Sequence, residues 1–141
     1  RRTLKAGGRV AVIVFSTPER NSWGAVPASI IRRRARLPPP VPGQPGPFSL
    51  GGPSVLEGVL RQAGFSDPEV RAVPVPHRMG SAAEYVQVAR EAFGAFNAMM
   101  ANLPPLERDS VWNEVEASMR SFESAGGFEV PGECLVGAVI K

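Results

Sequence analysis

The pattern of hydrophobic positions begins with an unbroken apolar run, Val10 to Phe15, which follows the glycine pair Gly7-Gly8. A strand buried on one face alternates apolar and polar residues, whereas a strand covered by helices on both faces need not alternate. The run therefore predicts a buried strand with helices on both sides. Ligands of α/β sheets bind beyond the carboxyl ends of such strands, so Phe15, Ser16 and Thr17 are candidate site residues.

Helical spacing follows this strand. Asn21 or Ser22 can cap a helix that runs to about Leu37, and its regular part is predicted to begin near Ala25, because Pro27 is tolerated only near a first turn. A second helix is predicted over 53–63, with Gly64 at its end. The proline- and glycine-rich stretch 38–53 between them favours a surface connection, and long loops at the carboxyl end of a sheet also form active-site walls.

The second half of the chain predicts two further strands and a helical hairpin. Residues 69–76 alternate, but their prolines place them at a sheet edge, and 133–140 form a closing hydrophobic strand. Between them, Ser81 and Glu84 form a capping box for one helix over 81–103. Pro104-Pro105 end that helix, a second helix follows over 106–123, and 128–130 are predicted as a short extended piece.

Composition places the chain among ordinary globular proteins. It has 141 residues, 43% hydrophobic and 21% charged, which predicts one modest domain over 1–141. No apolar run reaches the roughly 18 residues of a membrane span. The only cysteine, Cys134, allows no intrachain disulfide and fits the reducing cytoplasm, where we place the protein.

Net charge is +3, and a cluster of cations lies at Arg32-Arg33-Arg34 and Arg36. The cluster is compatible with nucleic-acid binding or with a solvated helix end, where cations complement the helix dipole. We favour the helix end, because the cluster lacks the interleaved aromatic residues that single-strand binders use.

The segment Leu4-Lys5-Ala6-Gly7-Gly8-Arg9 resembles the L-K-P-G-G-x segment that leads into the fifth strand of class I S-adenosylmethionine-dependent methyltransferases. Further similar segments are Ser49-Leu50, Leu56, Leu60 and Ala63-Gly64-Phe65 before the family's sixth strand, and 133–139 as its last strand. The chain is most similar to the small-molecule branch that includes quinone-biosynthesis methyltransferases. The resemblance covers only the C-terminal half of that fold.

The resemblance implies an α/β fold: the C-terminal part of a Rossmann-like methyltransferase sheet. About three strands are expected, with the closing strand antiparallel between two parallel ones, and an inserted helical hairpin over 81–123. The implied function is the acceptor side of a methyltransferase for a small apolar molecule, as part of a longer enzyme and inactive alone. A non-catalytic α/β binding or dimerisation module is the alternative.

The family binds S-adenosylmethionine through a glycine-rich turn after its first strand and an acidic residue after its second. Gly7-Gly8 is not that turn, because it precedes a strand instead of joining a strand to a helix. No cofactor-binding residue, metal ligand or catalytic residue is therefore assigned to this chain.

Extra helices in the resembling families form a lid over the acceptor, so the hairpin is a candidate lid, with a plain hydrophobic core as the alternative. The candidate substrate-binding residues are Phe15, Ser16, Thr17, Trp23, Tyr85, Phe93 and Met100. His77 is a possible base, although an exposed loop histidine is the interpretation that we favour.

The strand over 10–15 also bears on partners. Without the neighbour that it has in the family, this strand has an unpaired apolar edge, and such edges pair with other chains. We therefore expect a homodimer through this edge. No nucleic-acid partner is expected.

Overall fold

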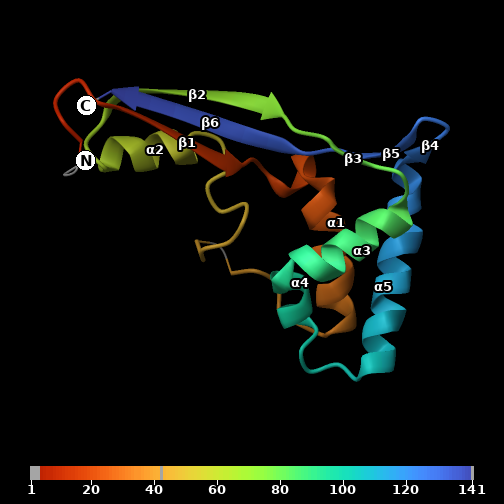
Figure 1. Ribbon diagram of the computed structural model, residues 1–141. Helices are drawn as coiled ribbons and strands as arrows, with labels where there is room; N and C mark the ends of the chain where they lie inside the picture. Colours follow the sequence, from red (N-terminus) through yellow and green to blue (C-terminus); the bar gives the residue numbers. More distant parts are fainter. Residues whose placement is uncertain (1–3, 42, 141) are drawn as a thin grey trace. The chain divides into compact units, whose positions relative to one another are not determined.

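The computed structural model describes residues 4–41 and 43–140 (Figure 1). These residues form a mixed α/β structure with two small antiparallel sheets. They divide into two compact units: unit 1 holds residues 4–21, 43–75 and 132–140, and unit 2 holds residues 22–41 and 76–131. Each unit is described by itself.

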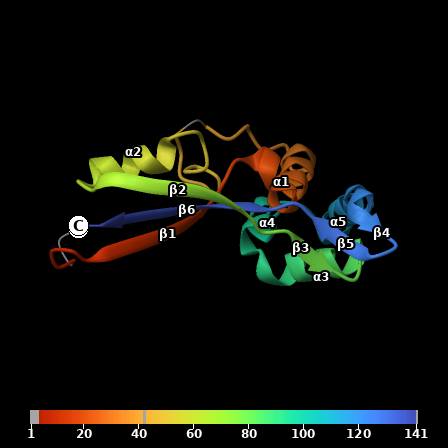
Figure 2. The same cartoon turned by 90° about the horizontal axis from the view of Figure 1, so that it is seen from above.

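Unit 1 contains a three-stranded sheet in the order β1 (Arg9–Phe15), β6 (Glu133–Ile140) and β2 (Ser66–Pro74). Both outer strands pair antiparallel with β6, so they run parallel to each other. Figure 2 shows the three strands side by side with β6 in the middle. The sequence-based prediction of a closing strand that lies antiparallel between two parallel strands is confirmed, and so is the edge position of β2.

One face of this sheet is covered by the short helix α2 (Val55–Gln62). Leu56 and Leu60 form a cluster with Phe65 and Val139, against which alternate residues of β1, including Val12, also pack. Gly137 makes this close packing possible, because a Cβ atom there would lie 3.1–3.2 Å from side-chain atoms of three neighbours. Gly64, at φ +84°, ends the segment as predicted.

The opposite face of the sheet carries exposed apolar side chains. Ile13 is 69% exposed, Ile140 56% and Val73 41%. Among the described residues of unit 1, α2 is the only α-helix. The prediction of helices on both faces of the first strand is therefore not met within unit 1.

Unit 2 combines four helices with a second small sheet. The helices are α1 (Ser22–Arg34), α3 (Ala82–Ala92), α4 (Gly94–Met99) and α5 (Pro105–Met119). The sheet has the order β3 (His77–Met79), β5 (Gly127–Val130) and β4 (Glu123–Ser124). Short 3-10 turns lie at Pro18–Arg20 in unit 1 and at Arg120–Phe122 in unit 2. The sequence predicted an extended piece at 128–130 but not the sheet.

The predicted continuous helix over 81–103 is wrong: the chain breaks at Phe93 into α3 and α4. The capping box at its start is present, since the Glu84 N–H donates to Ser81 Oγ at 3.1 Å. Gly94 follows the break, and glycine is a poor helix former. Asn97 compensates for the break, because its Nδ2 donates to the Arg90 carbonyl at 2.8 Å.

Helix α1 begins at Ser22, directly after the predicted cap residue Asn21 and three residues before the predicted regular part, and contains Pro27 in its interior. Proline has no N–H, so the carbonyl four residues earlier, that of Trp23, cannot receive its regular helical hydrogen bond. The Tyr85 hydroxyl donates to this carbonyl instead. A residue of α3 thereby supplies the donor that the sequence of α1 lacks.

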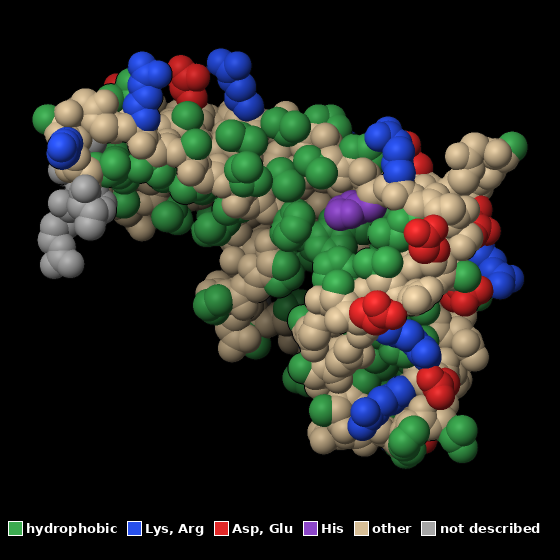
Figure 3. Space-filling model, in the orientation of Figure 1, with side chains coloured by type: hydrophobic (Ala, Val, Ile, Leu, Met, Phe, Trp, Pro, Cys, Tyr) green, Lys and Arg blue, Asp and Glu red, His purple; other side chains and the backbone are tan. Residues whose placement is uncertain are grey.

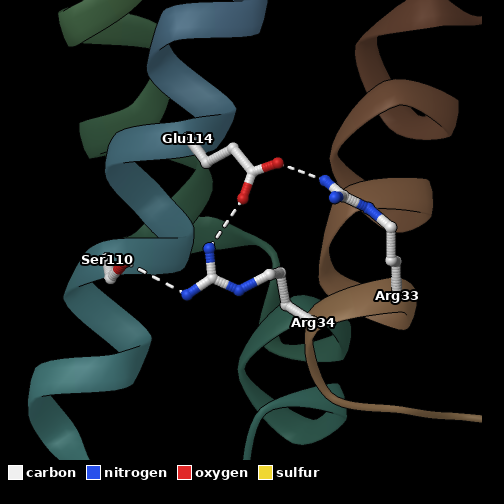
Figure 4. Close-up of polar contacts among 4 residues, drawn as sticks. All are labelled: Arg33, Arg34, Ser110 and Glu114. Atoms are coloured by element: carbon white, nitrogen blue, oxygen red, sulfur yellow. Dashed lines mark hydrogen bonds and ion pairs between the residues drawn. The ribbon is translucent and has the colours of Figure 1, made fainter.

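Arg32, Arg33 and Arg34 of the cationic cluster form the last turn of α1, a helix end as favoured from the sequence, and the side chains of Arg33 and Arg34 reach α5 (Figure 4). Arg34 donates to Glu114 Oε2 at 2.8 Å and to Ser110 Oγ at 3.1 Å. Arg33 binds the other oxygen of Glu114. These two guanidinium groups hold the pKa of Glu114 below its ordinary value.

Candidate functional site

The carboxyl end of β1 is fixed to the start of β6 by a buried asparagine. Asn21 Nδ2 donates to Ser16 Oγ at 3.2 Å and to the Thr17 carbonyl at 3.0 Å, while its Oδ1 accepts from the Glu133 N–H at 3.1 Å. The Ser16 N–H donates to the Glu133 carbonyl at 3.0 Å. Asn21 and Ser16 are 0% and 2% exposed, so these bonds are shielded from water.

The loop before α2 crosses directly over this strand end. A Cβ atom on Gly51 would lie 2.2 Å from the carbonyl carbon and oxygen of Ser16, so only glycine permits the approach. The Gly51 N–H donates to the Phe48 carbonyl at 3.1 Å. The Phe48 ring lies 6.1 Å from the ring of Phe15. The loop is thus held in place by backbone contact and by ring packing.

A cavity of about 300 Å³ lies between the strand end and the loop. Its walls are mostly apolar and come from Ile13, Val14, Phe15, Gly46, Pro47, Ser49, Leu50 and Cys134. The Ser49 hydroxyl donates to the Gly46 carbonyl at 2.9 Å. Among the lining residues only Cys134 is ionisable, so the cavity suits a small apolar group but offers no obvious base.

The three predicted site residues of unit 1 lie at this strand end but differ in role. Phe15 lines the cavity. The Ser16 side chain belongs to the buried asparagine network. The side chain of Thr17 hydrogen-bonds to Glu19 and lowers the pKa of that carboxyl. Sequence reasoning missed Asn21 in its bridging role and Gly51, although both lie within segments that it had identified as loops or helix starts.

The other four predicted site residues lie in unit 2. Tyr85 and Met100 are each 1% exposed, and Trp23 is 6% exposed. Tyr85 packs on Phe128 with ring centroids 5.4 Å apart. Burial of these three side chains agrees with a plain hydrophobic core, which was the alternative to a lid in the sequence analysis.

Phe93 differs from those residues, because it is half-buried at the break between α3 and α4. It is the middle member of a row of rings. The Trp23 ring lies 5.3 Å from Phe93 on one side, and the Phe96 ring lies 5.6 Å away on the other. The position of Phe93 therefore differs from that of the three core residues, because its ring packs between two other rings without being fully buried.

His77 lies in strand β3, which corrects the expectation of an exposed loop residue. Its ring packs on Trp23 at 5.0 Å between centroids. Its Nε2 is buried and has no hydrogen-bond partner among the described residues. Burial lowers the pKa of His77, so the neutral imidazole is favoured at neutral pH.

The glycine turn before β1 and the connection after β1 do not form the glycine-rich turn by which the resembling family binds S-adenosylmethionine. Gly7, at φ +73°, and Gly8 form a turn closed by the Gly8 N–H donating to the Lys5 carbonyl at 3.0 Å, and this turn precedes β1. The connection after β1 runs through Ser16-Thr17-Pro18 and contains no glycine. Neither segment forms the glycine-rich strand-to-helix turn of a nucleotide site.

The described residues contain no cluster of three or more histidine, cysteine, aspartate or glutamate side chains that could hold a metal ion. Within the same residues, no helix has the length and apolar character needed to cross a membrane. Comparison with protein-family models finds no match, and comparison with curated proteins finds no significantly similar sequence.

Proposed function

We propose that this chain is the acceptor-side part of an S-adenosylmethionine-dependent methyltransferase that acts on a small apolar molecule. The strand order carries the proposal. The resemblance of 4–9, 49–65 and 133–139 implies a closing strand antiparallel between two parallel strands, and β1, β6 and β2 have that order. The order of the three strands does not by itself identify an activity. The cavity is the second observation that supports the proposed function.

The cavity borders the last three residues of β1, next to the carboxyl end at which α/β enzymes bind ligands. Methyl transfer from a sulfonium depends mainly on aligning donor and acceptor in a site that excludes water. The apolar walls around Phe15 and Leu50 serve that purpose, and the Asn21 network keeps the strand end rigid. The cofactor is held by residues outside this chain under the proposal, because those of unit 1 do not fit it.

The test is methyl transfer from radiolabelled S-adenosylmethionine to a panel of small apolar acceptors. It uses the protein encoded by the complete reading frame that contains residues 1–141. Leu50→Trp fills the cavity and is expected to raise KM for the acceptor by about tenfold or more, with KM for the cofactor unchanged. Leu106→Trp is the matched control, because Leu106 is 85% exposed on α5.

Two results would contradict the proposal. One is the absence of methyl transfer to every acceptor in the panel. The other is an equal change of both KM values in the Leu50 and Leu106 variants. Calorimetry on the chain of residues 1–141 adds an independent check, because micromolar binding of S-adenosylmethionine would show that the cofactor site lies within it.

A further inference from the structure

The cavity of unit 1 has a buried inner end and an outer side formed by the loop. At the inner end Cys134 is only 8% exposed, and Phe15 and Leu50 are half-buried. On the outer side the loop residues Pro47 and Ser49 are exposed. A ligand therefore enters past the loop, and the part of it that goes in first meets the residues of the inner end.

The side chains that line the cavity have little capacity for hydrogen bonding. Ser49 carries the only hydroxyl among them, and it already donates its hydrogen to the Gly46 carbonyl at 2.9 Å. Cys134, whose thiol is a weak donor, is the only other polar side chain of the lining. The loop over 43–53 has no charged residue, and in Figure 3 this segment, below the sheet of unit 1, shows hydrophobic side chains and no charged ones. A polar group at the inner end would therefore lose its water without gaining a strong partner.

We propose that the cavity holds a hydrocarbon group of an amphiphilic acceptor, while the atom that receives the methyl group lies outside it, on the side of Ser49. For the acceptor, this inference rests on the proposed function. An oxygen, nitrogen or sulfur atom that accepts a methyl group is polar and needs the hydrogen-bond partners that the inner end lacks. The cavity of about 300 Å³ has roughly twice the volume of an apolar cavity that binds benzene. The hydrocarbon group is therefore about twice the size of benzene.

A hydrocarbon group bound in this cavity fixes the position of the acceptor from a distance. Binding energy from a part of a substrate that does not react can orient the atom that does. The wall formed by Phe15 and Cys134 is rigid, because Asn21 links the Thr17 carbonyl to the Glu133 N–H at the same strand ends. Since the inner end is buried, the residues that hold the cofactor adjoin the outer side of the cavity. The cavity is thus an anchor for the acceptor and is separate from the reacting atoms.

The experiment measures how n-alkanols slow the alkylation of Cys134 by iodoacetamide in the chain of residues 1–141. Cys134 is the only cysteine, so mass spectrometry gives its alkylation rate directly. Beginning with butanol, each added methylene is expected to lower the half-protecting concentration about fourfold. This gain should stop at about ten carbons, when the cavity is full. The octanediol with a hydroxyl at each end should protect about fivefold less well than octanol, or worse, because one hydroxyl enters the inner end.

Two variants test whether the protection occurs in the cavity. Leu50→Ala enlarges the cavity and should move the limit to alkanols that are longer by about three carbons, the number that the substitution removes. Leu106→Ala is the matched control, because it makes the same change at a position that is 85% exposed on α5, and it should leave the limit unchanged. Circular dichroism confirms that each variant is folded in the presence of the alkanol.

A second measurement uses the enzyme encoded by the complete reading frame. Its kcat/KM for acceptors with a lengthening alkyl group should rise about fourfold per methylene, up to the same limit. Protection that grows with chain length, without methyl transfer to any acceptor, would refute the proposed function and leave a hydrocarbon-binding site. Protection that is independent of chain length, or equal for octanol and octanediol, overturns the hydrocarbon site even where methyl transfer is found. A limit that moves equally in Leu50→Ala and Leu106→Ala overturns it as well.

Discussion

The hydrogen bond from Tyr85 to the Trp23 carbonyl makes a quantitative prediction about unit 2. Tyr85→Phe removes the donor but keeps the ring that packs on Phe128. Pro27 cannot supply the helical N–H, so the buried carbonyl loses the donor that replaces it. Leaving a buried acceptor without its partner costs about 1–3 kcal/mol, a large part of the roughly 5–15 kcal/mol that stabilises a typical protein.

A double-mutant cycle with Pro27→Ala separates this explanation from a general loss of packing. Alanine at position 27 restores the N–H that can donate to the Trp23 carbonyl. In the Pro27→Ala background, Tyr85→Phe should lower the free energy of unfolding by less than about 1 kcal/mol. The difference between its effects in the wild-type and Pro27→Ala backgrounds is the coupling energy. The effect of Pro27→Ala on packing is present in both members of the comparison and cancels.

The assay is urea unfolding followed by tryptophan fluorescence, because both tryptophans, Trp23 and Trp112, lie in unit 2. Tyr85 is the only tyrosine of the chain, so absorbance at high pH gives a second readout. Burial raises the pKa of Tyr85 far above its ordinary value, so tyrosinate should form only as the protein unfolds. If Tyr85→Phe lowers the free energy of unfolding equally in the wild-type and Pro27→Ala backgrounds, the Tyr85 hydroxyl does not replace the N–H that Pro27 lacks.

Three further predictions concern single residues. Asn21→Ala should lower the free energy of unfolding by about 2–4 kcal/mol, because it leaves its buried hydrogen-bond partners unsatisfied. The control Asn97→Ala, at an exposed position, should change it by less than about 1 kcal/mol. Equal effects of the two variants in urea unfolding followed by circular dichroism would contradict this prediction. Gly51→Ala should cost about 2 kcal/mol or more, because its Cβ would meet the backbone of Ser16, and an unchanged urea midpoint would contradict the close approach. The NMR titration of His77, the only histidine, should give a pKa below the ordinary 6.5. Because the unfolded chain then binds this proton at higher pH than the folded one, the free energy of unfolding should fall as pH drops below about 6.5 toward the folded-state pKa, and His77→Phe should abolish this dependence.

Local patterns were sufficient to predict the sheet of unit 1. Two strands were predicted from the apolar runs at 10–15 and 133–140, and the edge strand was predicted from the alternation and the prolines of 69–76. The resemblance implied the order of the three strands. The capping box at Ser81 and the glycine at 64 placed helix ends correctly, because caps act within one turn. These features depend on neighbours in the sequence, and a single chain contains that information.

The contacts that shape the candidate site depend on distant residues and had no local signal. Asn21 and Glu133 are 112 positions apart, and an asparagine before a helix is most simply interpreted as a cap. Gly51 is one of several glycines in its loop, and only its approach to Ser16 distinguishes it. The hydrogen bond to the Trp23 carbonyl also has no local signal. Nothing near Pro27 in the sequence indicates that a tyrosine of another helix supplies the missing donor.

The unbroken apolar run of β1 has an explanation that differs from the one first drawn from it. Helices on both faces would account for the run, but unit 1 supplies one α-helix among its described residues, and that helix covers Val10, Val12 and Val14. Phe15 is accounted for by Phe48 and the cavity wall. Ile13 borders the same cavity, although its side chain is still 69% exposed. The absence of alternation in this strand is therefore explained by α2 on one face together with the loop and cavity at its carboxyl end, without a second helix layer in unit 1.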